Sequence, residues 1–190
     1  YRAIREDKKV SFRFFHYDRE KKKQYSKSGG RYIVSPYAIL WNDGRTTKEC
    51  DYLNQVIGKE RLSAYTANIS FTGFTAPKVL WMKNNEPENF AKIKKIMLPK
   101  DYLAYKLTGE HCTDVSDASG MLLLDVKNRC WSKEMCEICG ITTDMLPKLY
   151  ESYECVGTVL PEIAKELGLS ENVKVAVSYT HLTLPTNSLV

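Results

Sequence analysis

The sequence predicts an α/β fold over residues 41–177, preceded by a short β-hairpin within residues 1–40. Residues 41–177 alternate between apolar positions three or four apart, as on one helix face, and short apolar runs typical of buried strands. Residues 1–40 contain two runs that alternate apolar and polar residues, as half-buried strands do. Hydrophobic residues make up 43% and charged residues 27%, which is ordinary for a globular protein.

The N-terminal hairpin is expected to pair residues 10–14 with residues 31–34. This segment is basic, with eleven Lys or Arg against four Asp or Glu, whereas residues 41–190 carry a net charge of −2. The whole-chain charge of +5 therefore belongs to one end, which is the only part considered for nucleic-acid binding.

Helices and strands alternate in the central segment. Pro99 and Pro161 are typical of helix starts, and Gly109 and Gly168 of helix ends. Thr75 is the expected N-cap of the second helix. Helices are expected over residues 46–57, 76–85, 88–95, 100–107 and 161–167. Strands are expected over residues 38–41, 121–126 and 173–177.

The six cysteines predict neither a disulfide framework nor a metal site. Cys136 and Cys139 form the one CxxC pair, and a zinc site lacks a second pair or nearby histidines. Both are expected on the inward face of a helix that starts near Ser132. No apolar run approaches the roughly 20 residues that a membrane-spanning helix needs.

Four motifs carry a family resemblance: WNDGRT at 41–46, GFTAPKVLW at 73–81, LPKDYLAYKLTGE at 98–110 and TDVSDASGMLLLD at 113–125. In this order they resemble the xylulokinases of the FGGY carbohydrate kinases. The resemblance implies an incomplete N-terminal domain with a ribonuclease-H-like, actin-like ATPase core and extra helices. It further implies a cytoplasmic enzyme that uses ATP and Mg²⁺ to convert D-xylulose to D-xylulose 5-phosphate.

The same resemblance points to one wall of a sugar site, formed by Trp41, Asn42, Asp43 and Arg45. Trp41 matches a tryptophan that lines the pocket of related glycerol kinases, and an indole offers an apolar face and one N–H donor. Two structural alternatives stay open. Asp43-Gly44 is also a good turn sequence, and Arg45 could serve only to pair with a nearby acid.

Two further stretches have a chemical and a structural interpretation. Asp114 and Asp117 have the spacing of an acid–base pair, but Asp and Ser commonly cap loops, and the structural role is favoured. Lys78 follows a single glycine, too little for a phosphate loop, so a helix start is the preferred interpretation.

Several family elements are not found in the sequence. The proton-accepting Asp of a Gly-Asp-Asn turn is expected just after Val177, and an Asp-x-Gly-Thr phosphate turn is expected upstream of Trp41. We therefore assign no catalytic, cofactor-binding or metal-ligating residue. We expect this chain alone to bind no ATP or Mg²⁺ and to be inactive.

The two ends differ from the kinase pattern. Residues 1–40 resemble the start of a WYL domain, through 8–18 and 29–43, and residues 178–190 resemble translated sequencing adapter. The expected layout is therefore a partial WYL-like fragment, a partial kinase domain over 41–177 and a non-native tail, joined as a chimera. The alternative function is a fragment of a WYL-type transcriptional regulator that binds nucleic acid or nucleotide.

Overall fold

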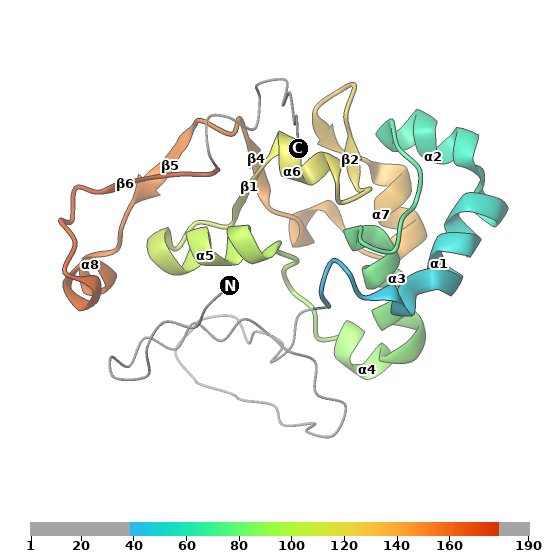
Figure 1. The fold of residues 1–190 in the computed structure, drawn as a ribbon, viewed down its shortest axis with the longest axis horizontal. Helices are drawn as coiled ribbons and strands as arrows, with labels where there is room; N and C mark the ends of the chain where they lie inside the picture. The colour runs from blue at the N-terminus through green and yellow to red at the C-terminus, as the bar shows by residue number, and fades with distance from the viewer. Residues whose placement is uncertain (1–38, 179–190) are drawn as a thin grey trace.

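The computed structural model describes residues 39–178, and Figure 1 shows their arrangement. Helices α1, α2, α3 and α7 gather at one end, and β5, β6 and α8 lie at the other, with α5 and β1 between them. The hairpin expected to pair residues 10–14 with residues 31–34 lies outside the described residues, which include only the last two positions of the segment 1–40. The tail expected over 178–190 lies outside them beyond Ser178.

Helical segments follow one another through the first part of the described chain. The α-helices are α1 (Thr47–Asp51), α2 (Lys59–Thr66), α3 (Thr75–Asn85), α4 (Pro87–Phe90), α5 (Pro99–Thr108), α6 (Val115–Ser119), α7 (Lys133–Cys139) and α8 (Pro161–Leu167). The other helical segments are the 3₁₀ turns η1 (Gly44–Thr46) and η3 (Thr143–Met145) and the π-helix η2 (Tyr52–Gly58).

The described strands form three two-stranded sheets. The pair β1 and β4 is parallel, with Cys112 opposite Lys148, and the other two pairs are antiparallel. The strands are β1 (Cys112–Asp114), β2 (Leu124–Asp125), β3 (Cys130–Trp131), β4 (Lys148–Tyr150), β5 (Cys155–Thr158) and β6 (Lys174–Ala176). Along the chain, helix α5 precedes β1 and helix α6 follows it, as expected for part of an α/β domain.

Helices bounded by proline and glycine match the sequence expectation. Helices α5 and α8 each begin at a proline, and each is followed by a glycine in the left-handed region, Gly109 at φ 82° and Gly168 at φ 68°. Proline fits the first turn because its missing N–H has no partner there, and glycine reaches positive φ without a Cβ clash. Ser132 caps α7 by accepting a hydrogen bond from the Met135 amide at 3.2 Å.

Some expected helix bounds differ from the structure. The helix expected over 46–57 is present as 3₁₀, α and π segments and is interrupted at Gly58, at φ 96°, but the chain then continues into α2, which was not predicted. The helix expected over 88–95 ends at Phe90. Thr75 is the first residue of α3 and not its N-cap, a position held by Phe74 without a side-chain hydrogen bond.

Two expected strands are also wrong in extent. Within 121–126, only Leu124–Asp125 is extended and paired, because Leu122 adopts a left-handed φ of 59° that interrupts a strand. The described part of the strand expected over 38–41 has no strand pairing, and Trp41 and Asn42 form a turn. The strand expected over 173–177 is confirmed as β6.

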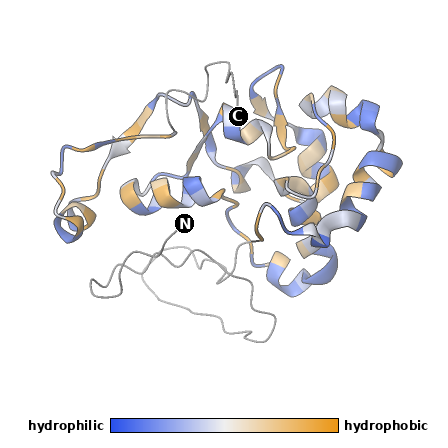
Figure 2. Ribbon diagram, viewed as in Figure 1, coloured by the Kyte–Doolittle hydropathy of each residue, from blue (hydrophilic) through white to orange (hydrophobic). Residues whose placement is uncertain are grey.

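The larger core lies between α3, α7, η2 and the segment 121–124. Figure 2 shows hydrophobic residues on α3, α7 and β2, and buried residues of these elements pack in one cluster. A smaller cluster of Ala104, Cys112, Val156 and Val177 joins α5 to β1 and β5. Fully or almost fully buried side chains of the larger cluster include Leu53, Leu62, Met121, Leu122, Leu123, Leu124, Met135 and Cys139.

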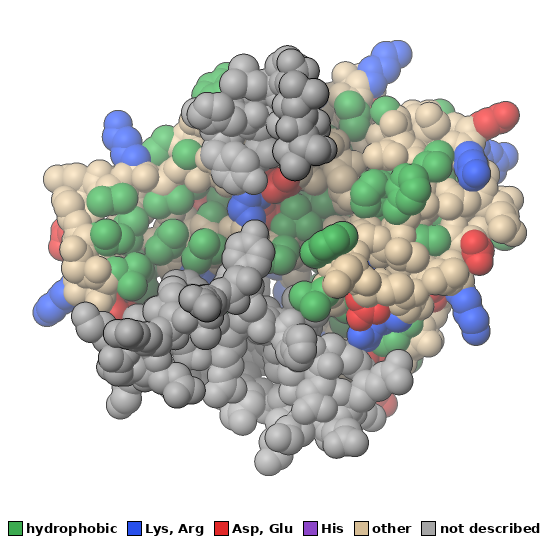
Figure 3. Space-filling view, viewed as in Figure 1, with side chains coloured by type: hydrophobic (Ala, Val, Ile, Leu, Met, Phe, Trp, Pro, Cys, Tyr) green, Lys and Arg blue, Asp and Glu red, His purple; other side chains and the backbone are tan. Residues whose placement is uncertain are grey.

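Apolar side chains remain exposed near the smaller cluster. Leu103 on α5 is 44% exposed, and Leu169, just after α8, is 43% exposed. Figure 3 shows hydrophobic side chains gathered over this end of the molecule. Among residues 39–178, no helix has both the length and the apolar character needed to span a membrane.

Candidate functional site

The WNDGRT motif begins with a tight turn that exposes an indole. The amide of Asp43 donates to the carbonyl of Leu40 at 3.1 Å, which closes the turn around Trp41 and Asn42. The side chain of Trp41 is 79% exposed, and Asn42 is exposed beside it. The described residues therefore leave most of the Trp41 surface uncovered.

Asp43 and Arg45 hold this turn against η1. Asp43 accepts a hydrogen bond from the amide of Arg45 at 3.0 Å, which caps the 3₁₀ helix. The Arg45 guanidinium donates to Oδ2 of Asp43 through Nε at 2.9 Å and through Nη2 at 2.5 Å. This side-chain hydrogen bonding holds the pKa of Asp43 below its ordinary value. The ion pair considered from the sequence is therefore present.

A second contact joins Arg45 to helix α3. The Arg45 guanidinium lies over the ring of Trp81, 4.8 Å from its centroid, a geometry in which cation and ring attract each other. Residue 81 belongs to the GFTAPKVLW motif, so the two motifs meet through Arg45. The sequence did not identify Trp81 as a neighbour of the site.

The loop before α3 supports the turn from its other side. Thr46 Oγ1 donates to the carbonyl of Thr72 at 3.2 Å, and Lys78 Nζ donates to the same carbonyl at 2.5 Å. A Cβ at Gly73 would lie 3.0 Å from the carbonyl oxygen of Trp41, closer than almost all such contacts. Glycine at 73 therefore permits the close approach of the two loops.

Lys78 is a member of this site that sequence reasoning assigned to a helix start. Its ammonium is half-buried, and burial lowers the pKa of Lys78, while the carboxylate of Asp43 opposes that shift. Gly73 was the one signal in the sequence for this close packing. The four predicted residues thus lie in one turn and the 3₁₀ helix after it, with Trp41 and Asn42 exposed and with Asp43 and Arg45 bonded to each other.

The second candidate cluster, TDVSDASG, forms a buried ionic centre around Lys100. Lys100 Nζ lies 2.9 Å from Asp101 Oδ1, 2.8 Å from Asp114 Oδ1 and 3.4 Å from Asp117 Oδ2. The side chains of Asp101 and Asp114 are fully buried. Asp114 also accepts from Ser152 Oγ at 2.7 Å.

Two of the three carboxylates in this centre also accept hydrogen bonds from backbone amides. Asp114 caps α6 by accepting from the amide of Asp117 at 3.4 Å, and Asp101 accepts from the amide of Leu98 at 2.9 Å. Burial by itself would raise the pKa of Asp114, but hydrogen bonds from Lys100 and Ser152 hold this pKa below its ordinary value. The capping role favoured from the sequence is thus seen for Asp114, whereas the carboxylate of Asp117 contacts Lys100.

The CxxC pair lies in the core. Cys136 and Cys139 are both buried on α7, and burial raises the pKa of Cys136 to about 11 and that of Cys139 to about 12. Protonated thiols are poor metal ligands, since the thiolate is the form that binds metal. Among residues 39–178, no group of three or more His, Cys, Asp or Glu side chains is arranged to hold a metal ion.

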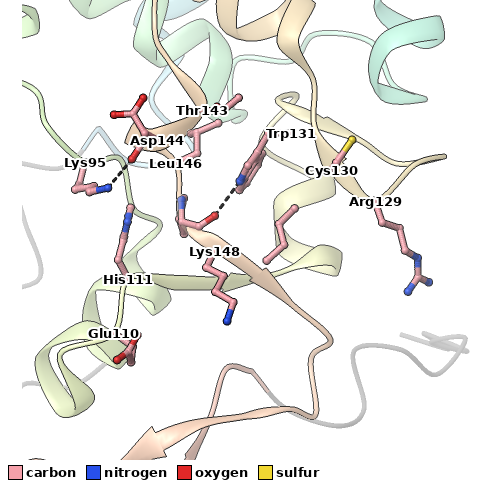
Figure 4. Close-up of a pocket in the computed structure, with 12 residues that line it drawn as sticks. Lys95, Glu110, His111, Arg129, Cys130, Trp131, Thr143, Asp144, Leu146 and Lys148 are labelled. Atoms are coloured by element: carbon pink, nitrogen blue, oxygen red, sulfur yellow. Dashed lines mark hydrogen bonds between the residues drawn. The ribbon is translucent and has the colours of Figure 1, made fainter.

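A cavity of about 600 Å³ lies next to β1, β3 and β4, away from the Trp41 turn (Figure 4). His111 Nε2 lies 3.1 Å from the carbonyl of Ile96, and Trp131 Nε1 donates to the carbonyl of Pro147 at 2.8 Å. Burial lowers the pKa of His111. Lys95 donates to the carbonyl of Asp144. These polar groups are occupied by protein partners, so we assign this cavity no ligand.

Comparisons with known proteins support an α/β sugar-kinase domain. A crystal structure described as a xyloylose kinase from Brucella ovis has a TM-score of 0.69 and 42% identity, and the match covers 73% of this chain and 28% of that one. The structure of Plasmodium falciparum glycerol kinase with ADP matches with a TM-score of 0.65 and 27% identity, over 72% of this chain and 28% of that one. The fold and the paired motifs thus define the chain as part of a carbohydrate kinase.

The sequence comparisons name the family. Residues 34–180 match the N-terminal domain of the FGGY family of carbohydrate kinases, and the chain belongs to this family. Xylulose kinase from Escherichia coli K12 is 47% identical over 133 residues, which are 70% of this chain and 27% of that protein. Xylulose kinase from Lactococcus lactis is 49% identical over 138 residues, or 73% and 27%. The chain thus spans about 27% of the length of these two relatives.

Proposed function

We propose that this chain is part of an ATP-dependent kinase that converts D-xylulose and ATP to D-xylulose 5-phosphate and ADP. The observation that carries the proposal is the 47% identity over 133 residues to the Escherichia coli protein named xylulose kinase. The matched family domain, residues 34–180, includes all four motifs, from WNDGRT at 41–46 to TDVSDASGMLLLD at 113–125. The alternative of a WYL-type regulator concerns residues 1–40 and gains no support from this match.

Within this enzyme, we propose that Trp41, Asn42, Asp43 and Arg45 form one wall of the sugar site. The exposed indole of Trp41 presents an apolar face to the C–H groups of the sugar, and the amide of Asn42 offers donors and an acceptor for hydroxyl groups. Asp43 and Arg45 act mainly by holding the turn, since their side chains are bonded to each other at 2.5 Å. Trp81, Gly73 and Lys78 support that turn from α3 and the loop before it.

Phosphoryl transfer also needs a base for the hydroxyl proton and a Mg²⁺-bound triphosphate. The carboxylates around Lys100 do not fit a metal, because an ammonium already occupies their centre. We therefore propose that ATP and Mg²⁺ are held by parts of the kinase other than residues 39–178. For the chain itself we propose that the kinase segment spans residues 41–177. A partial WYL-like fragment over residues 1–40 precedes it, and a non-native tail over residues 178–190 follows it.

A segment exchange tests the proposed reaction. Residues 41–177 replace the matching segment of Escherichia coli xylulose kinase, and D-xylulose-dependent ADP release is measured with a coupled assay. We expect the hybrid to be active on D-xylulose, because the exchanged sugar wall is equivalent. The 190-residue chain alone is the control and is expected to release no ADP. A folded hybrid that phosphorylates another polyol and leaves D-xylulose unreacted contradicts the proposal.

Replacing Trp41 with alanine in the same hybrid is expected to raise the KM for D-xylulose roughly tenfold, the loss of about 1.4 kcal/mol of binding. The physical reason is the loss of the apolar face against which the sugar packs. Tyr153→Ala is the matched control, because Tyr153 is an aromatic residue that is 61% exposed and lies outside the turn. An unchanged KM for D-xylulose in Trp41→Ala would show that Trp41 is not part of the sugar wall.

A further inference from the structure

A second cavity, of about 700 Å³, lies where α1, α3 and α7 meet. We call it the Glu49 cavity. Its volume is within the range of small-molecule sites, and its lining combines aromatic, charged and amide side chains. The lining residues used below are Lys48, Glu49, Tyr52, Trp81, Lys83 and Asn84.

Glu49 has a carboxylate oxygen without a partner. The residue is only 6% exposed, and its Oε1 accepts from Asn84 Nδ2 at 3.3 Å. Its Oε2 is buried and has no hydrogen-bond partner within the described structure. An unsatisfied buried carboxylate oxygen costs free energy, and most such groups in folded proteins have a partner. A donor seated in the cavity would supply the missing hydrogen bond.

The charges around the cavity decide what kind of donor fits. Lys48 and Lys83 both line it, and neither ammonium makes a hydrogen bond or an ion pair in the described part of the chain. The side chain of Lys83 packs over Gly140, the residue that follows α7 and has a φ of 71°. A Cβ at position 140 would lie 2.5 Å from the Nζ of Lys83. Two lysines without partners among the described residues repel a cationic ligand, so a neutral donor such as a hydroxyl suits Glu49 and an anion suits the lysines.

Two aromatic rings complete the lining. Tyr52 is 43% exposed, and Trp81 is partly buried beneath the Arg45 guanidinium. Such rings pack against the C–H faces of polyols. We propose that the Glu49 cavity binds a phosphorylated polyol, whose hydroxyls bond to Glu49 and Asn84 and whose phosphate lies between Lys48 and Lys83.

This site is separate from the proposed sugar wall. Trp41, Asn42 and Asp43 do not line the Glu49 cavity, and Arg45, which does, has its guanidinium bonded to Asp43 and stacked on Trp81. Arg45 thus stands between the two sites. The cavity shares Arg45 and Trp81 with the support of the sugar wall, but the groups proposed to bond to its ligand, Lys48, Glu49, Lys83 and Asn84, are not part of that wall.

Isothermal titration of the 190-residue chain with D-xylulose 5-phosphate tests the site, with inorganic phosphate and xylitol as separate probes. We expect saturable binding of the phosphorylated polyol and weak or no binding of either half alone. Lys83→Met and Glu49→Gln are each expected to weaken binding roughly tenfold or more, because each removes a charge-assisted hydrogen bond. Lys92→Met is the matched control, since Lys92 is exposed and does not line the cavity.

The remaining outcomes overturn the proposal. Equal affinity for inorganic phosphate shows an unspecific anion contact, and absence of saturable binding shows that the cavity has no such ligand. Loss of binding in Trp41→Ala, with Lys83→Met unchanged, places the ligand at the sugar wall instead. Circular dichroism of each variant establishes that Glu49→Gln is folded, and Lys83→Met, at an exposed position, serves as the second variant.

Discussion

Replacing Lys100 with methionine is expected to lower the free energy of unfolding by about 3–5 kcal/mol, the cost of leaving buried carboxylates unpaired. Lys100 is the ammonium shared by Asp101, Asp114 and Asp117, and the first two side chains are fully buried. Burial by itself would lower the pKa of Lys100, but the charge of Asp101 and the hydrogen bond to Asp114 outweigh this effect and raise the pKa. The lysine therefore stays charged wherever the fold is stable. Urea unfolding followed by circular dichroism measures the loss.

The pH dependence of this variant separates a charge effect from a packing effect. Without the lysine, burial raises the folded-state pKa of the carboxylates above the unfolded value of about 3.9. A group with a raised folded pKa contributes stability below its unfolded pKa and loses it as pH rises through the folded pKa. Lys100→Met is therefore expected to recover part of its stability as the pH falls from neutral toward 4.

Lys106→Met on the same helix is the matched control. Lys106 is exposed, and its loss is expected to cost less than about 1 kcal/mol. Adding Asp101→Asn to Lys100→Met is expected to restore part of the loss, because one buried charge is then removed with its partner. Equal stability of Lys100→Met and Lys106→Met contradicts the role assigned to this centre.

Replacing Leu123 with alanine is expected to lower the free energy of unfolding by about 2–5 kcal/mol. Leu123 is fully buried in the larger core, and its carbonyl accepts from the amide of Ser132 at 2.8 Å. The truncation removes buried apolar surface and leaves a cavity beside α7, which a segment held by such backbone bonds cannot easily fill. The loss is measured by the same urea unfolding.

Leu103→Ala provides the comparison for this variant. Leu103 is 44% exposed on α5, so its truncation creates no enclosed cavity and is expected to cost less than about 1 kcal/mol. If Leu123→Ala is no more destabilising than Leu103→Ala, the segment 121–124 is not part of a packed core. Because both variants change leucine to alanine, the difference between them reports mainly the difference in burial, since helix propensity adds only a few tenths of a kcal/mol at Leu103.

Local signals in the sequence were sufficient for some elements and misleading for others. Helices α5 and α8 were predicted closely, since proline and glycine act on the backbone where they stand. The apolar run 121–124 was predicted as strand, but Leu122 adopts a left-handed φ of 59°. Four consecutive buried residues satisfy several backbone conformations equally, so the pattern does not choose among them.

The candidate site divides in the same way. The WNDGRT motif identified Trp41, Asn42, Asp43 and Arg45 as neighbours, because they are adjacent in the chain. The pairing of β1 with β4, which joins residues 112–114 to 148–150, was not predicted. Trp81 stacks on Arg45 from 36 positions away, and no local pattern announces such a contact.

By itself, the sequence determined the kinase family, the positions of α3, α5, α8 and β6, the helix ends set by proline and glycine, and the inward position of the CxxC pair. Only the tertiary structure decided that Lys100 contacts three carboxylates, that Gly73 gives room to the Trp41 turn, and that Glu49 is buried with one oxygen unpaired beside a cavity. The physical reason is the range of the forces involved. Backbone preferences act within a few residues, whereas burial and charge pairing depend on which distant segments pack together.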